Sequence, residues 1–472
     1  MFTSYSSRPH YCTYVQVEKI LASFPETLQT PGDFLLYSLL SSSFIWLDLQ
    51  QRELLAGLQT LEEGLSDEHY YCLEKRLRRC SEAASIMLQQ AEIAKFHLIY
   101  KQAEMSFSLH SDNFPILDNV LGALTKIMPL LQKKTRSEIS PGKDELFALT
   151  AALNDKVMLF KNILEKLITD LEPKVSNSVI NLNSLISEEV LLQPALDTLN
   201  KHHHKALTRN SPSMDELTFI ISHQTFELWF PIVLMSIDEV IGELTSDKLN
   251  IVAAEMQIRK ITSLFKLFSS MIRMPQTMTA SDYLAFRSQL QGGSGAESIG
   301  FRLIEISLGL RDPLYLAKLH TMNLMTEELS ARLCQPSLSD VYLNLLKKHE
   351  IISEGANDDA VAYAIASELR PTEAIDKHSE PIWLGESLID LEQSIDLWRQ
   401  YHLSMVRRMI GYRPSLGVGG HEPVKSGTHD ASTDRPIDGV AHLIQTLRLR
   451  IFPYLWSARS KISEDALMAY RA

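Results

Sequence analysis

Two histidines of this chain, His402 and His223, fall on apolar faces of predicted helices. The segment LWRQYHLSMVRRMIG (397–411) places these apolar side chains on the helical face of His402: Trp398, Met405, Val406 and Met409. Because a buried imidazole needs partners for its ring nitrogens, this histidine either hydrogen-bonds to a carbonyl or carboxylate or binds a metal. An apolar wall with one imidazole is also what a haem iron requires on its proximal side. The residues alone leave both interpretations open.

His223 repeats this arrangement among aromatic rings. On a helix it shares one face with Phe219, Phe226 and Phe230. An imidazole on such a wall could act as a distal group or a base above a flat aromatic ligand. Ordinary core packing is the alternative. The run His202-His203-His204 precedes a predicted helix and is interpreted as solvated, with no metal assigned.

Arg287 is the third side chain that could take part in ligand binding. In SDYLAFRSQL (281–290) it lies one helical turn after Tyr283, and the glycine-rich stretch 292–295 follows directly. A guanidinium beside flexible backbone N–H groups is suited to bind a carboxylate. A surface salt bridge is the alternative.

The elements that must position these residues are helices. Strand-type alternation is nearly absent, and helical periodicity predicts an all-α fold. The predicted helices are 14–23, 32–64, 70–105, 114–134, 143–171, 179–191, 215–244, 248–272, 281–290, 297–308, 313–333, 338–350, 384–411 and 437–458. The long Gly- and Pro-rich stretch 411–439 separates the last two, and loops of this length are usually functional or disordered.

A faint internal repeat indicates two helical regions. Residues 33–49 resemble 215–231 in apolar rhythm and in the opening aspartate, and Ser41 stands where the second copy has His223. Chance similarity of two amphipathic helices is the alternative. We therefore predict an N-terminal helical region over 1–172, as a degenerate repeat without haem, and a catalytic domain over 173–472.

Composition narrows the functional class. The net charge of -12 argues against a nucleic-acid or anionic-membrane partner, because either would require a basic face. No segment reaches the apolar length that spans a bilayer, and the N-terminus lacks the apolar core of a signal peptide. The cysteines show neither zinc spacing nor Cys-x-x-Cys pairing and are interpreted as reduced thiols: Cys12, Cys72, Cys80 and Cys334. The sequence predicts a cytoplasmic protein.

Three segments together resemble the tryptophan 2,3-dioxygenase family. They are DELTFIISHQTFELWF (215–230), MTASDYLAFRSQLQGGSGAESIGFRLIE (278–305) and WRQYHLSMVRRMIG (398–411). They occur in the family's order and with similar spacing, which is more specific than a single motif. The resemblance extends from about Val179 to Trp456, and the N-terminal region exceeds the family pattern. It implies an all-helical haem b enzyme that uses O2 to cleave the indole C2–C3 bond of tryptophan to N-formylkynurenine.

The resemblance also assigns roles to individual residues. His402 matches the proximal haem ligand, and His223 matches the distal histidine that contacts the indole N–H. Arg287 matches the arginine that pairs with the substrate carboxylate. The remaining matches are Phe219 and Tyr283 in the indole pocket, Ser294 and Gly295 in the loop beside the haem, and Phe301 at a position that is often aromatic.

One departure concerns the substrate's ammonium group. The family's Gly-Thr-Gly-Gly loop contacts that group through its threonine, whereas this chain has Val418 between Gly417 and Gly419. Valine offers no hydroxyl. Two alternatives to tryptophan cleavage therefore stay open. One is a haem-dependent oxygenase that hydroxylates or rearranges another aromatic amino acid or indole, and the other is a non-catalytic haem-binding protein.

The resemblance finally implies self-association. In the family, two protomers complete each other's sites and pair again into a tetramer. A fused, decayed copy could take a partner's place. We therefore expect a homo-oligomer, either a dimer or a tetramer, with a small aromatic substrate as the other partner.

Overall fold

The computed structural model describes twelve ranges of the chain: 54–55, 67–100, 108–109, 115–133, 143–171, 179–180, 214–287, 298–321, 324–369, 380–411, 443–444 and 446–471. In these ranges the protein is all-α, as predicted, apart from two very short strands. Contacts within the chain divide it into two compact units. The first comprises Met1–Leu228 with Ser270–Tyr283, and the second comprises Trp229–Ser269 with Leu284–Ala472.

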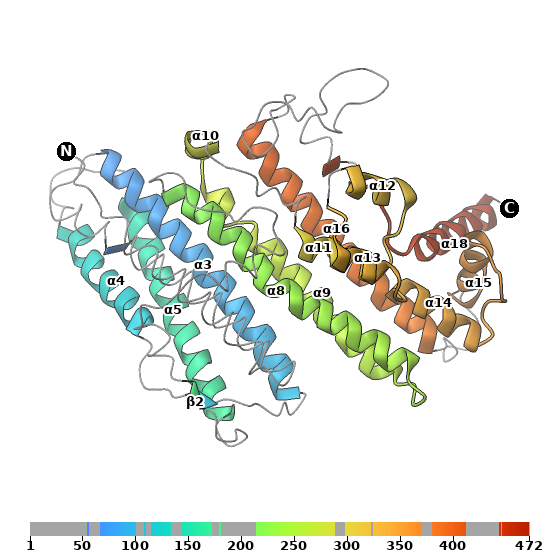
Figure 1. Ribbon diagram of the computed structural model, residues 1–472. Helices are drawn as coiled ribbons and strands as arrows, with labels where there is room; N and C mark the ends of the chain where they lie inside the picture. Colours follow the sequence, from blue (N-terminus) through green and yellow to red (C-terminus); the bar gives the residue numbers. More distant parts are fainter. Residues whose placement is uncertain are drawn as a thin grey trace. The chain divides into compact units, whose positions relative to one another are not determined.

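The first unit contains a group of long helices. Its elements are α3 (Asp67–Tyr100), β1 (Ser108–Leu109), α4 (Pro115–Lys133), α5 (Lys143–Leu171), β2 (Val179–Ile180), the first part of α8 (Met214–Thr245), the end of α9 (Ile251–Met271), η3 (Pro275–Thr277) and the start of α10 (Ala280–Arg287). Helix α5 packs against both α3 and α4 (Figure 1). Strands β1 and β2 pair in parallel, with Ser108 opposite Val179.

Apolar periodicity explains why these helices pack. Fully buried side chains line the contact between them: Leu77, Ala84, Leu124, Leu153 and Phe160. One polar exception is Lys156 of α5, whose Nζ lies 2.8 Å from Ser81 Oγ and 3.0 Å from Ser85 Oγ of α3. These hydroxyls compensate the lysine for lost water contacts.

The second unit contains the remaining helices. They are the rest of α8 and α9, the end of α10, α11 (Ile299–Leu308), α12 (Pro313–Thr321), α13 (Glu327–Leu333), α14 (Leu338–Lys348), α15 (Asp358–Leu369), α16 (Glu380–Ile410) and α18 (Pro453–Arg471). Every residue of α11 is buried. Helix α11 contacts α13 and α14, and α16 contacts α14, α15 and α18.

Local signals define several helix ends in this unit. Ser298 begins α11 by accepting a hydrogen bond from Phe301 N, and Gly309, with a φ of 128°, ends it. Ser337 and Asp340 form a capping box at the start of α14. A side chain at Gly309 would meet Ser339 and would also be strained, because L-residues rarely adopt this φ.

The structure corrects three of the predicted helical ranges and adds one helix. The range 313–333 is two helices, because Thr326 caps a new helix by accepting from Leu329 N. The range 437–458 does not form one helix; the chain turns at 447–448, and α18 begins only at Pro453. Helix α15 was not predicted. Val179–Ile180 pairs as a strand where a helix was expected.

Proline explains the position of the last correction. Its missing N–H suits the first helical position, so Pro453 favours a helix start at this point. The N–H groups of Ile451 and Phe452 donate instead to the Glu392 carboxylate, at 2.7 and 3.1 Å. A distant carboxylate therefore replaces the helical hydrogen bonds that periodicity alone predicted.

Other sequence predictions lie outside the described ranges or stay predictions. The predictions outside the described ranges are those for the first repeat copy, 33–49, and for most of the range 411–439. The domain boundary between 172 and 173 stays a prediction. In the described part of the chain, every helix is too short or too polar to cross a lipid bilayer.

Candidate functional site

Helices α8 and α10 bring three of the predicted site residues together in the first unit. The ring of Phe219 lies 4.3 Å from that of His223, centroid to centroid, on the same helix. It also lies 5.7 Å from the ring of Tyr283, which α10 supplies. Phe219 and Tyr283 are buried, whereas His223 is half-buried. The predicted aromatic wall around His223 therefore includes a ring from a second helix.

The hydrogen bond of His223 fixes one of its protons. Its Nδ1 lies 2.8 Å from the backbone oxygen of Phe219, one helical turn earlier. A carbonyl oxygen can only accept, so Nδ1 carries the proton in this contact. In the neutral ring, Nε2 then holds the lone pair and is a hydrogen-bond acceptor.

The start of α10 is held by a capping arrangement. Thr279 N donates to Asp282 Oδ2 at 2.8 Å, and Asp282 N donates to Thr279 Oγ1 at 3.2 Å. These reciprocal bonds fix the first turn of α10. Tyr283 follows Asp282 directly, so the cap also fixes where this ring starts from the backbone.

Helices α11 and α16 bring a second group together in the other unit. Trp398 and His402 lie one turn apart on α16, with ring centroids 6.0 Å apart and nearly parallel planes at 16°. Phe301 of α11 lies 4.5 Å from Trp398. Met405, Val406 and the other apolar residues of this face are buried, and His402 is half-buried. The predicted apolar wall around His402 is thus present.

A buried charged cluster lies beside this wall, and sequence reasoning missed it. Glu305 Oε1 lies 2.7 Å from Arg399 Nη2, and Glu305 Oε2 lies 2.8 Å from Arg302 Nη1. Tyr315 donates to Glu305 Oε2 at 2.6 Å. Burial raises the pKa of Tyr315, so its hydroxyl stays protonated and able to donate. The available signal was a pair of opposite charges, Arg302 and Glu305, in a helix whose other residues are apolar except for Ser307.

A second carboxylate network connects α16 to the C-terminal segment. Glu392 accepts from two backbone N–H groups and from Trp456 Nε1 at 2.9 Å. Burial raises its pKa above the ordinary glutamate range, although these hydrogen bonds oppose the shift. Asp396 lies 2.7 Å from Arg450 Nη1. Both carboxylates connect the middle of α16 to the segment from Arg450 to Trp456.

The other predicted site residues are distributed less informatively. Arg287 is the last residue of α10 and is half-buried. Ser294, Gly295 and Val418 lie outside the described ranges. Their roles stay predictions.

The apolar surroundings of His402 fit those of a haem-ligating histidine. A haem needs an apolar wall with a single imidazole, rather than a cluster of several ligands. His402 stacks beside Trp398 on a face of buried aliphatic and aromatic side chains. Within the described ranges, no group of three His, Cys, Asp or Glu side chains could hold a bare metal ion. The buried apolar face that carries His402 therefore suits a haem whose iron this imidazole would bind.

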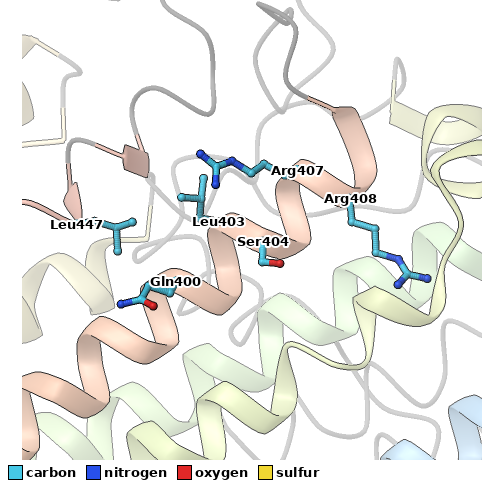
Figure 2. A pocket seen from close by; sticks show the side chains of 6 residues that line it. All are labelled: Gln400, Leu403, Ser404, Arg407, Arg408 and Leu447. Carbon is cyan, nitrogen blue, oxygen red and sulfur yellow. The ribbon is translucent and has the colours of Figure 1, made fainter.

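A pocket of about 620 Å³ opens along another face of α16 (Figure 2). Its described lining residues are Gln400, Leu403, Ser404, Arg407, Arg408 and Leu447. Figure 2 shows Arg407 and Arg408 pointing in different directions. None of these side chains belongs to the predicted site.

Comparisons with known proteins identify relatives of the chain. The family model for tryptophan 2,3-dioxygenase matches residues 195–363. A tryptophan 2,3-dioxygenase of Herpetosiphon aurantiacus is 32% identical over 258 residues, which cover 54% of this chain and 91% of the relative. One from Caulobacter vibrioides is 32% identical and covers 52% and 90% of the two chains. One from Bacillus cereus is 28% identical over 323 residues and covers 66% and 99%.

These matches and the helical architecture define the class of protein as an all-α oxidoreductase of the dioxygenase type. The chain belongs to the tryptophan 2,3-dioxygenase family. The predicted family is therefore confirmed. The family model begins at residue 195, so α3, α4 and α5 lie outside its match.

Proposed function

We propose that this protein is a haem-dependent dioxygenase that cleaves the indole C2–C3 bond of L-tryptophan or a close derivative. The product would be of the N-formylkynurenine type. The observation that carries this proposal is the apolar wall of α16, on which His402 stacks beside Trp398 in a chain of this family. The aromatic group around His223 supports it, because a flat indole needs such a surface.

The haem would be held by His402 as the iron ligand and by apolar contacts. Phe301, 4.5 Å from Trp398, supports the wall on which His402 lies. Ser294 and Gly295 are the further haem contacts in this proposal. When bound, haem b supplies the iron centre at which dioxygen is taken up and activated.

His223 would orient the indole. Its Nδ1 proton is donated to Phe219 O at 2.8 Å, so the neutral ring presents the Nε2 lone pair. That atom can accept a hydrogen bond from an indole N–H. The indole is a weak acid, so this role requires orientation of the ring and no full deprotonation. Phe219 and Tyr283 would line the indole's faces.

Arg287 would bind the substrate's carboxylate. A guanidinium pairs with a carboxylate through two parallel hydrogen bonds, which fixes direction as well as distance. This contact would hold the amino acid so that its ring reaches the oxygen-binding side, which is a positioning role.

Val418 favours a second candidate function. The side chain of valine has no hydroxyl with which to contact an ammonium group. In this second candidate function, the protein hydroxylates or rearranges another aromatic amino acid or indole. A non-catalytic haem-binding protein is the weaker alternative, since such a protein would need neither His223 nor Arg287.

One experiment tests the proposal directly. Ferrous protein is mixed anaerobically with L-tryptophan, and oxygen is then added. We expect the near-ultraviolet absorbance of N-formylkynurenine, with one O2 consumed per product. Arg287→Met should weaken turnover of L-tryptophan more than that of tryptamine, which lacks the carboxylate. A haem spectrum without any product would favour the second candidate, and purified protein without haem would refute both.

We also propose that the chain is a homo-oligomer, a dimer or a tetramer, in the cytoplasm. In this proposal residues 1–172 form a degenerate repeat and 173–472 the catalytic domain. A degenerate repeat that occupies the position of a partner protomer favours the dimer. Sedimentation as a clear tetramer would count against this role of residues 1–172.

A further inference from the structure

We propose that Lys75 and Arg79 of α3 are positioning residues for the substrate pocket, because they hold the first turns of α8 and α10 together. This inference rests on the proposed function in one respect: Phe219, His223 and Tyr283 are taken to contact the substrate. It assigns a role to a helix that lies outside the match to the family model.

The contacts form a bridge between two aspartates. Lys75 Nζ lies 3.2 Å from Asp215 Oδ1 of α8 and 2.5 Å from Asp282 Oδ2 of α10. Arg79 Nη2 also contacts Asp215 Oδ1. Arg79 Nε donates to Thr277 Oγ1 of η3 at 3.0 Å. One face of α3 therefore binds three structural elements of the pocket region, namely α8, η3 and α10.

Burial shields this bridge from solvent more than a surface ion pair. The side chain of Arg79 is 3% exposed, and those of Lys75 and Asp215 are each 17% exposed. Water and salt screen such charges much less than exposed ones. The Lys75 hydrogen bond lowers the pKa of Asp282 against the opposing effect of burial, which keeps this carboxylate charged.

The bridge acts at the positions from which two pocket rings emerge. Asp215 lies in the first turn of α8, one turn before Phe219, and Asp282 directly precedes Tyr283 in the first turn of α10. The rings of Phe219 and Tyr283 contact each other at 5.7 Å across the two helices. The distance between the two aspartates, which Lys75 bridges, therefore sets the distance between the two rings.

The same carboxylates also stabilise their own helices. An acidic side chain in the first turn interacts favourably with the helix N-terminus, and Asp282 in addition accepts from Thr279 N at 2.8 Å. Loss of Lys75 would leave both aspartates near each other with one cation fewer. Their repulsion would separate α8 from α10 rather than unfold either helix.

Hydrogen exchange and substrate binding together test this inference. The variants are Lys75→Met, which removes the bridging charge, and Lys75→Arg, which keeps it. The matched control is Arg78→Met on the same helix, because Arg78 is 52% exposed and pairs with Glu74 one turn away. Exchange is read in peptides that cover 214–222 and 275–287, with 338–348 in the other unit as reference. Binding of L-tryptophan is read from the haem spectrum of ferric protein.

We expect Lys75→Met to speed exchange in the two pocket peptides and to weaken L-tryptophan binding, each by about tenfold, while 338–348 and haem content stay unchanged. Lys75→Arg should restore most of both effects, and Arg78→Met should cause neither. Unchanged exchange in Lys75→Met, or faster exchange with unchanged binding, would overturn the inference. If the wild-type protein bound no L-tryptophan, the proposed substrate would be wrong, and selective exchange would still decide whether the bridge exists.

Discussion

Glu305 of α11 and Arg399 of α16 form a buried ion pair, with Oε1 and Nη2 2.7 Å apart and side chains only 2% and 5% exposed. Their neighbours on the two helices form an aromatic contact, because Phe301 precedes Glu305 by one turn and Trp398 precedes Arg399. The charged and aromatic pairs together fix α11 against α16. His402 follows one turn after Trp398, so these contacts determine where its imidazole lies.

Replacement of Glu305 should strongly destabilise the protein. Glu305→Gln leaves two buried guanidiniums, Arg302 and Arg399, without their shared carboxylate. Removal of one partner from a buried pair costs about 3–5 kcal/mol. Urea unfolding monitored by circular dichroism would measure this loss. Glu354→Gln is the control, because Glu354 is 85% exposed in its pair with Lys347 and should contribute less than about 1 kcal/mol. Equal losses in both variants would contradict the role of burial.

The two described free cysteines should differ in reactivity. Burial raises the pKa of the Cys80 thiol to about 12, whereas Cys334 is exposed. Since the thiolate is the reactive form, iodoacetamide at about pH 8 should alkylate Cys334 and spare Cys80. Peptide mapping by mass spectrometry reads the two sites separately. In denaturant Cys80 should react as fast as Cys334, and rapid alkylation of Cys80 in the native protein would show that α3 is not packed as described.

The helices that carry His223 and His402 were predictable from sequence because their apolar residues repeat at helical spacing. The family was predictable from three ordered segments. The Glu305–Arg399 pair was not, because it joins residues 94 positions apart and no local pattern specifies which helices meet. The Lys75 bridge to Asp282 spans 207 positions and was hidden for the same reason.

Local sequence patterns also gave a wrong prediction where a distant side chain takes the backbone hydrogen bonds of a predicted helix. The range 437–458 has helical periodicity, yet Glu392 accepts the N–H groups of Ile451 and Phe452 and the helix begins at Pro453. Tertiary contacts of this kind override local propensity. The roles of Ser294, Gly295 and Val418 stay predictions, because the described ranges do not include them.

The Glu392 carboxylate should make stability depend on pH. Burial raises its folded-state pKa above the value in the unfolded chain, so the folded protein binds the proton more tightly. Its contribution to stability is therefore fully present below the unfolded pKa and is lost as pH rises through the folded pKa. Glu392→Gln removes this titration.

The measurement compares the free energy of unfolding of Glu392→Gln with that of the wild type at about pH 5 and about pH 8. The free energy of unfolding of the wild type, relative to that of Glu392→Gln, should be larger at the lower pH. All other titrating groups are the same in both proteins, so their contributions cancel in this difference. Asp390→Asn is a control on the exposed side of the same helix. A wild-type advantage that grows with pH would contradict the raised pKa.

His402→Ala should abolish haem retention without loss of the fold. His402 is half-buried on α16, and alanine is a strong helix former, so the helix should persist and only the iron ligand should be lost. The haem content of purified protein, from its pyridine haemochrome, measures the effect, and circular dichroism checks the helices. His320→Ala is the matched control, because His320 is an exposed histidine on α12 of the same unit.

Imidazole added to the His402→Ala protein should restore part of the haem binding, since it can occupy the position of the missing ring. A histidine that only packs in the core would give no such rescue. Normal haem content in His402→Ala would exclude this residue as the ligand and, with it, the proposed arrangement of the site on α16.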